Sequence, residues 1–147
     1  MSTTDANKRL LTAIFESLAA SDSRPLIEHL SPDAAWTVKG NTPWSRTYRG
    51  KNAILAELLR PLGRRLATRY RAKAERILAD GNHVVVEAQG EATTVAGLPY
   101  NNEYCFVYRL EDGYIVEVVE YTDTELVRSA LGTIPESDPA PSIDRLA

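Results

Sequence analysis

Residues 97–124 read GLPYNNEYCFVYRLEDGYIVEVVEYTDT, and this stretch decides the fold. It contains two runs rich in aromatic and β-branched side chains, separated by Glu111-Asp112-Gly113. Such runs are typical of β-strands, and an Asp-Gly pair between them is typical of a hairpin turn. The stretch therefore predicts two long antiparallel strands joined by a tight turn.

The first run has one apolar face and one polar face. Its even positions carry Tyr104, Phe106, Tyr108 and Leu110, whereas its odd positions include charged side chains such as Arg109. Because side chains alternate across a strand, the even positions are predicted to face the interior.

The length of the turn decides which acidic residue of the second run faces the interior. A three-residue loop at 111–113 places Tyr104 opposite Glu120 and turns Glu120 inward. A two-residue Asp112-Gly113 turn shifts the register by one residue and turns Glu117 inward instead. We prefer the first register, since it keeps Val116 and Val118 opposite the aromatic residues of the other strand.

The strand predicted to start at His83 has two possible inner faces. Periodicity alone buries the small apolar face, which consists of Val84, Val86 and Ala88. If a partner subunit covers that face, the opposite face lines the interior with Glu87, Gln89 and Glu91. The pattern does not decide between the two.

The first half of the chain is mainly helical. Apolar residues at helical spacing predict helices over 5–20, from Ser23 onward, and from 52 to about 62, and a further short helix over 123–131 closes the domain. Strands are predicted at 34–39 and 68–75. Helices followed by an antiparallel meander indicate an α+β domain whose curved sheet and few helices enclose a pocket. We expect one domain over 1–132 and a flexible proline-rich tail over 133–147.

Composition limits the classes of function. The 147-residue chain has a net charge of −3 and a single cysteine, Cys105, so we expect a cytoplasmic protein without disulfides and no binding to nucleic acid. No stretch is long and apolar enough for a membrane span or a secretory signal. His29 and His83 lack ligand-like spacing and no phosphate-binding loop is present, so no metal and no cofactor are expected.

The chain resembles a known family over roughly residues 5–131. The segments 36–54 (WTVKGNTPWSRTYRGKNAI), 84–94 (VVVEAQGEATT) and 97–124, together with the order of the helices, are similar to the SnoaL-like and ketosteroid isomerase-like branch of the nuclear transport factor 2-like superfamily. The resemblance implies a cone-shaped, cystatin-like roll, a small hydrophobic or polyketide-like ligand, and a homodimer formed through the outer face of the sheet. Val84, Val86 and Ala88 are compatible with that interface.

The resemblance also separates the reactions of the family. Where ketosteroid isomerases carry a tyrosine, an aspartate base and a second acid, this chain has Ile14, Val38 and Phe106, which disfavours that mechanism. Aligned with limonene epoxide hydrolases, Glu120 takes a catalytic aspartate position, but Glu87 and Gln89 replace the arginine and the second aspartate. The same alignment implies pocket positions for Glu91, Asn102, Tyr104 and Thr122.

These patterns predict a proton-transfer site. Glu120 and Glu87 are the candidate acid and base, because two carboxyl groups in an aromatic cavity repel each other and resist ionisation. The candidate donor to a developing oxyanion is Tyr104, with Asn102 or the protonated acid as alternatives. The alternative is that Glu120 is a buried acid satisfied by a hydrogen bond to Tyr104 or Asn102. The candidate substrate-binding residues are Trp36, Val38, Trp44, Tyr48, Gln89, Glu91, Asn102, Phe106, Val118 and Thr122.

Three functions fit this prediction. The first is a cofactor-independent isomerase, cyclase or hydrolase acting on a small apolar carbonyl, enol or epoxide compound. The second is a non-catalytic ligand-binding or accessory dimer, and the third is a purely structural dimer whose pocket is filled.

Overall fold

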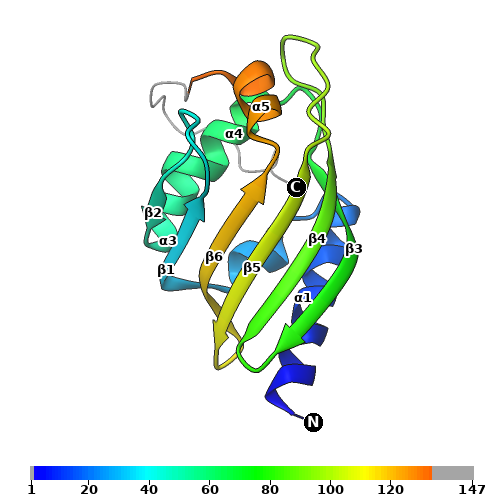
Figure 1. Cartoon of the computed structure of the whole chain (residues 1–147), viewed down its shortest axis with the longest axis vertical. Helices are drawn as coiled ribbons and strands as arrows, with labels where there is room; N and C mark the ends of the chain where they lie inside the picture. The colour runs from blue at the N-terminus through cyan, green and yellow to red at the C-terminus, as the bar shows by residue number, and fades with distance from the viewer. Residues whose placement is uncertain (1, 134–147) are drawn as a thin grey trace.

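A computed structural model of the chain describes residues 2–133 and shows one curved sheet with its helices on one face (Figure 1). The six strands lie in the order β2-β1-β6-β5-β4-β3. Their bounds are β1 Leu30–Val38, β2 Thr47–Arg49, β3 Arg71–Asp80, β4 His83–Glu91, β5 Glu103–Glu111 and β6 Tyr114–Thr122. The α+β architecture predicted from the sequence is confirmed.

The strands β3 to β6 form the expected antiparallel meander, and β1 adds to β6 in parallel. The short strand β2 pairs with β1 in antiparallel orientation at the far edge. One parallel pair therefore sits within an otherwise antiparallel sheet.

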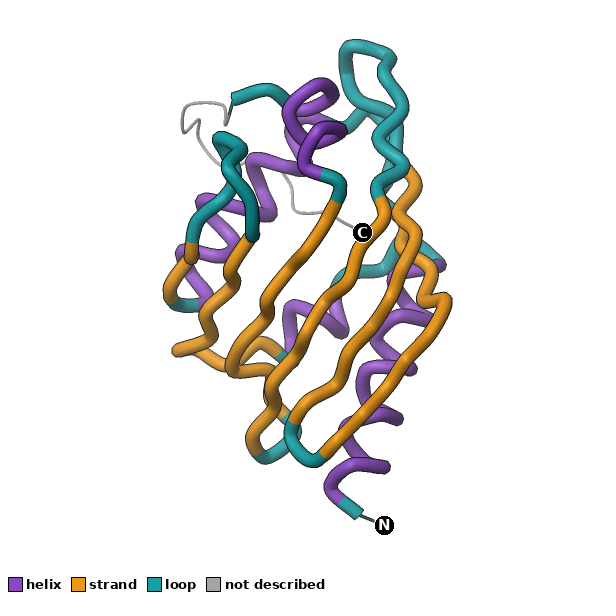
Figure 2. The backbone as a smooth tube through the Cα atoms, in the orientation of Figure 1, coloured by secondary structure: helices purple, strands orange, loops and turns teal. Residues whose placement is uncertain are grey.

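The helices cover only part of the concave face. They are α1 (Thr3–Ala19), α2 (Arg24–Glu28), α3 (Lys51–Ala53), the π-helix η1 (Ile54–Leu59), α4 (Arg60–Arg65), α5 (Thr124–Leu126) and the π-helix η2 (Val127–Leu131). Helix α1 packs against β3 and β4 with the apolar stripe Leu11, Ile14, Phe15 and Leu18. In the tube view of Figure 2 the strands lie in front of α1, α2 and α4, and no helix within residues 2–133 covers the outer face of the sheet.

The β5–β6 hairpin corrects the predicted register. Glu111 pairs with Tyr114 across a two-residue turn in which Asp112 and Gly113 both have positive φ, at 50° and 80°. That combination matches the right-handed twist of a hairpin. The three-residue loop, and with it the pairing of Tyr104 with Glu120, was wrong.

A β-bulge nevertheless keeps Glu120 on the inner face. Arg109 pairs with Glu117 and Leu110 pairs with Ile115, so Val116 is an extra residue on β6. One extra residue reverses the alternation of the strand beyond it. Phe106 consequently pairs with Glu120.

Strand β4 turns its apolar face inward. Val84 and Val86 have no accessible surface, and Ala88 is buried beside them. The alternative in which these three residues meet a partner subunit is therefore wrong, because α1 and the core already cover them. Their polar neighbours lie on the outer face.

The sequence also predicted a flexible tail and no membrane-spanning segment. Apart from Thr133, the predicted flexible tail lies outside the described residues. Within residues 2–133, no helix combines the length and apolar composition needed to cross a bilayer.

Candidate functional site

A small cavity lies between the concave face of the sheet and the helices. Its volume is about 80 Å³, and its walls are mostly apolar. It is lined by Phe15, Leu18, Ser23, Leu26, Trp36, Val38, Trp44, Leu58, Leu59, Leu62, Leu66, Tyr70, Ala72, Tyr100, Tyr104, Phe106, Tyr108, Glu120, Val127 and Leu131. This volume has room for more than one water molecule, which needs only about 10–15 Å³.

Glu120 is the carboxylate of this cavity. Strand pairing places it between Val38 of β1 and Phe106 of β5, two apolar neighbours on the same face. Among the lining residues in the described part of the chain, no other side chain carries a carboxylate and none carries a cationic group. A charge on Glu120 therefore has no ionic partner in the cavity wall.

The hydrogen-bond partner of Glu120 is Trp36. The Trp36 indole Nε1 donates to Glu120 Oε1 at 3.0 Å. Trp36 lies opposite Val118, the residue two positions before Glu120, and this diagonal arrangement lets the indole reach the carboxylate. The sequence had instead suggested Tyr104 or Asn102 as the partner.

The surroundings of Glu120 bring the pKa of its carboxyl group close to neutral pH. Burial raises the pKa of the Glu120 carboxyl to about 7, and the Trp36 hydrogen bond opposes this increase. A carboxyl group with such a pKa can both accept and release a proton near pH 7.

Four tyrosines add phenolic hydroxyl groups to the wall. Tyr70, Tyr100, Tyr104 and Tyr108 all border the cavity, and burial raises the pKa of each hydroxyl, that of Tyr100 to about 12. Their hydroxyls therefore stay protonated and can donate hydrogen bonds. Of these four tyrosines, only Tyr104 was predicted from the sequence to belong to the site. The alternation of Tyr70 with charged neighbours was a signal that could have added it.

Part of the predicted set is brought together. Trp36, Val38, Trp44, Tyr104, Phe106 and Glu120 all line the cavity. Their common signal was position on the inner face of a strand, or, for Trp44, in the loop that follows β1.

Glu87 is not part of the site. It lies on the outer face of β4, where its side chain is 43% exposed and forms an ion pair with Arg76. The hydrogen bond from Arg76 lowers the pKa of Glu87. The predicted pair of interacting carboxyl groups is therefore wrong, since the sheet separates them.

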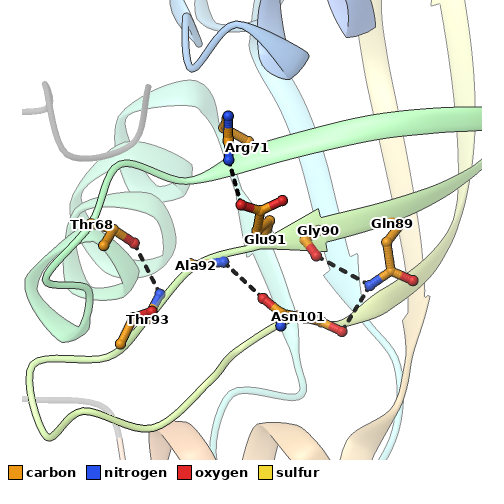
Figure 3. Close-up of polar contacts among 8 residues, drawn as sticks. All are labelled: Thr68, Arg71, Gln89, Gly90, Glu91, Ala92, Thr93 and Asn101. Atoms are coloured by element: carbon orange, nitrogen blue, oxygen red, sulfur yellow. Dashed lines mark hydrogen bonds and ion pairs between the residues drawn. The ribbon is translucent and has the colours of Figure 1, made fainter.

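Gln89 and Glu91 lie on the outer face of β4 with Glu87, and Figure 3 shows their polar contacts. Gln89 donates to the backbone oxygens of Gly90 and Asn101, and Glu91 forms an ion pair with Arg71. They share the face of Glu87 because β4 alternates regularly, so their predicted place in the pocket was wrong.

Asn102 and Thr122 form hydrogen bonds within the fold and do not line the cavity. Asn102 Nδ2 donates to the Tyr100 hydroxyl at 3.3 Å and to the Asp123 backbone oxygen at 3.2 Å, while its Oδ1 accepts from two backbone amides. The Thr122 hydroxyl donates to the Glu103 backbone oxygen. Both side chains are used in joining β5 to the end of β6, and neither lines the cavity.

Tyr48 and Val118 are buried next to residues that line the cavity. The Tyr48 hydroxyl donates to the Trp44 backbone oxygen at 2.8 Å, and Val118 is fully buried between Tyr108 and Trp36. The structure thus places both in the core and not on the cavity surface.

The cavity is covered at one end by two segments that are far apart in sequence. Trp44 Nε1 donates to the Gly132 backbone oxygen at 2.9 Å, and Arg128 donates to the Asn41 backbone oxygen at 2.7 Å. Val127 and Leu131 of η2 and Leu58 and Leu59 of η1 add apolar wall. π-Helical turns are frequent at functional sites.

Comparison with known proteins identifies the family. A sequence model of the SnoaL-like domain matches residues 11–118. The chain belongs to this family. No curated protein sequence matches it.

Solved structures share the fold of this SnoaL-like protein. An NTF2-like protein of unknown function from Burkholderia pseudomallei is 22% identical with a TM-score of 0.74, and the match covers 89% of this chain and 98% of that chain. A candidate SnoaL-like polyketide cyclase from Jannaschia sp. CCS1 is 17% identical with a TM-score of 0.73, covering 92% and 97%. TerC, crystallised with polyporic acid, is 19% identical with a TM-score of 0.71, covering 86% and 98%. At these identities the likeness shows a shared fold, and function is argued from the site.

Proposed function

We propose that this SnoaL-like protein binds a small, largely apolar carbonyl or enol compound in the cavity and moves a proton on it without a cofactor. Glu120 is the proposed base, and Tyr104 is the proposed hydrogen-bond donor to the oxygen that gains charge. The observation that carries the proposal is the Glu120 carboxyl itself, which lies in an apolar wall with a pKa of about 7. Trp36 fixes one carboxylate oxygen and leaves the other for the substrate.

The size of the cavity supports a small substrate. Its volume of about 80 Å³ is below the roughly 300–1,000 Å³ of typical ligand pockets. The Jannaschia relative and the polyporic acid complex of TerC support a ring-containing, polyketide-like compound as the ligand class. A polyketide-like ligand larger than the present cavity requires the Trp44 loop and η2 to move outward.

Proton transfer is better supported than epoxide hydrolysis. Ring opening of an epoxide benefits from a group that protonates the leaving oxygen while another activates water. Glu87 and Gln89, at the positions of the remaining triad residues, lie on the outer face of the sheet. A lone base with nearby tyrosine donors suits abstraction of a proton next to a carbonyl group.

Deuterium exchange tests the proposal without knowledge of the natural substrate. Cyclopentanone, a small cyclic ketone, is incubated with the protein in D₂O, and loss of its α-hydrogen signals is followed by NMR. Positioned general bases contribute about 10²–10⁴-fold, so Glu120→Gln should reduce the catalysed exchange by about 100-fold or more. Glu16→Gln, the same change at an exposed position of α1, should leave the rate unaltered.

A non-catalytic binding protein is the second candidate. It is favoured by the absence of any cationic partner for Glu120 among the described lining residues. In that case cyclopentanone binds but exchanges no faster with wild-type protein than with Glu120→Gln.

We further propose a homodimer through the outer sheet face, at a row of residues different from that expected from the sequence. Successive strand pairings align Leu78, Val85, Val107 and Val119 in one row across β3, β4, β5 and β6. Ion pairs flank this row on both sides, Arg76 with Glu87 and Arg109 with Glu117. In a dimer with its two-fold axis along this row, the side of the row with Arg76 and Glu87 in one copy faces the side with Arg109 and Glu117 in the other copy. Charges of opposite sign can then meet across the interface.

A further inference from the structure

Gly90 marks a gap in the inner face of β4. The inner positions of this strand carry Val84, Val86 and Ala88 before Gly90, which lies opposite Ala72 of β3. A Cβ atom on Gly90 would lie 2.8 Å from Tyr104 Cε2 and 3.0 Å from the Tyr70 hydroxyl oxygen. Gly90 does not have the positive φ of the turn glycines, so space rather than backbone conformation requires glycine here.

The gap at Gly90 is filled by the rings of Tyr70 and Tyr104. The two rings meet edge to face, with centroids 6.3 Å apart and planes at 87°. The other side of Tyr104 stacks on Phe106 at 4.9 Å and 13°. Tyr104 is thus held between two aromatic neighbours, and its ring has little freedom to rotate away from the cavity.

The hydroxyl groups of this pair are both shielded from water. Burial raises the pKa of the Tyr70 and Tyr104 hydroxyls well above the usual value. Tyr100, which also borders the cavity, accepts a hydrogen bond from Asn102 Nδ2, so its own proton points elsewhere. The result is a cluster of protonated hydroxyls in a wall that is otherwise apolar.

Glu120 and this cluster are close enough to act on one small molecule. Tyr104 pairs with Thr122 and Glu120 pairs with Phe106, so Tyr104 and Glu120 are diagonal neighbours on the inner face. Such neighbours have backbones about 7–8 Å apart, and a small ring fits within reach of both side chains.

We propose that Tyr70 is a positioning residue which, seated over Gly90, aims the Tyr104 hydroxyl at a ligand oxygen, so that the pair selects ketones and related oxygen acceptors. This inference rests on the proposed function and names the specificity-determining part of the same site. Buried donors left without a partner are costly, which gives the pair its power to discriminate against ligands lacking the oxygen.

Paired ligands and infrared spectroscopy test the role of Tyr70. Binding of cyclopentanone is compared with that of methylenecyclopentane, which has the same shape but no oxygen, and the carbonyl stretching band of the bound ketone is recorded. Wild-type protein should bind the ketone about three- to tenfold more tightly and shift its carbonyl band to lower frequency. Tyr70→Phe should remove most of the preference and of the shift, and Gly90→Ala should do the same by displacing both rings.

Tyr48→Phe is the matched control, because it deletes one buried tyrosine hydroxyl that does not line the cavity. It should keep the ketone preference and the band shift. Equal binding of the two ligands by wild-type protein, or an unchanged band in Tyr70→Phe, would overturn the inference.

The two proposals can fail separately. If no deuterium exchange occurs but the band shift depends on Tyr70, the proposed catalysis fails and the inference holds. If Glu120-dependent exchange occurs while Tyr70→Phe leaves the band unchanged, the inference fails and the catalysis holds.

Discussion

At the scale of single residues, the site depends on one carboxyl group that the fold keeps away from water. An acid in an apolar wall costs stability when it is ionised, and the Trp36 indole offsets only part of this cost. Functional sites commonly combine such a perturbed group with a cavity. Because of the same cost, the ionisation of Glu120 should affect the free energy of unfolding of the whole protein.

Stability should fall as pH rises through the range in which Glu120 ionises. Its folded pKa of about 7 lies above the ordinary value of 4.5, so between these values the folded state binds more protons than the unfolded state. Stability due to this group is full below about pH 4.5, decreases up to about pH 7 and then levels off, by a total on the order of 3 kcal/mol. Urea unfolding at pH 5 and pH 8 should show this loss in wild-type protein and not in Glu120→Gln. Parallel behaviour of the two proteins would contradict a buried, ionising Glu120.

Removal of the Trp36 indole should shift the titration of Glu120. Trp36→Phe deletes the hydrogen bond that stabilises the ionised carboxylate, so the pKa of Glu120 should rise further above 7. The pH midpoint of ketone exchange should move upward with it. Trp44→Phe deletes an indole that donates to Gly132 instead and should keep the midpoint in place. An unshifted midpoint in Trp36→Phe would show that the indole does not set the charge state of Glu120.

At the scale of elements, the sequence predicted strands and faces better than registers. The alternating residues of β5 correctly placed Tyr104 and Phe106 inside, because alternation reports directly on burial. The turn was predicted one residue too long, and the bulge at Val116 was not predicted, yet the two errors compensated at Glu120. A bulge adds one residue without a composition of its own, so a sequence pattern cannot reveal it.

Strand β4 illustrates a different limit. Its alternation separates Val86 from Glu87, but which face is the inner one depends on what packs against each side. Helix α1, which is distant in sequence, packs against β3 and β4 and so determines which face of β4 is the inner one. Tyr70 is a partial exception, because its alternation with charged neighbours indicates the inner face, whereas its place against Tyr104 depends on the space left at Gly90.

Deletion of Val116 should be far more damaging than its truncation. Without the extra residue, Ile115 and Glu120 can no longer both face inward while the Asp112-Gly113 turn stays in place. We expect a loss on the order of 2–4 kcal/mol in the free energy of unfolding, similar to the loss of a large core side chain. Val116→Ala keeps the bulge and should cost about 1 kcal/mol or less. Equal stability of the two variants in urea would show that the bulge does not set the register.

At the scale of the whole molecule, the two faces of the sheet have different tasks. The inner face holds the cavity and almost all of the large buried side chains, including Phe106, Tyr108 and Ile115. Among the described residues no helix lies over the outer face (Figure 1). This face presents a central apolar row between ion pairs. Exposed sheet surfaces of this kind are usually covered in solution.

Val107 lies in the middle of that row, between Val85 and Val119, and is only partly exposed within one chain. In a homodimer it would be buried against a second copy, where an unpaired charge is strongly unfavourable. Val107→Lys should therefore convert a species of twice the 16.3 kDa chain mass into one of single mass in sedimentation equilibrium. Val95→Lys places the same charge on a residue that is 59% exposed in the loop between β4 and β5, and it should leave the mass unchanged. A wild-type protein of single mass, or a Val107→Lys variant of undiminished mass, would contradict the dimer. Because the cavity opens on the opposite side of the sheet, Val107→Lys should retain ketone binding even as a monomer.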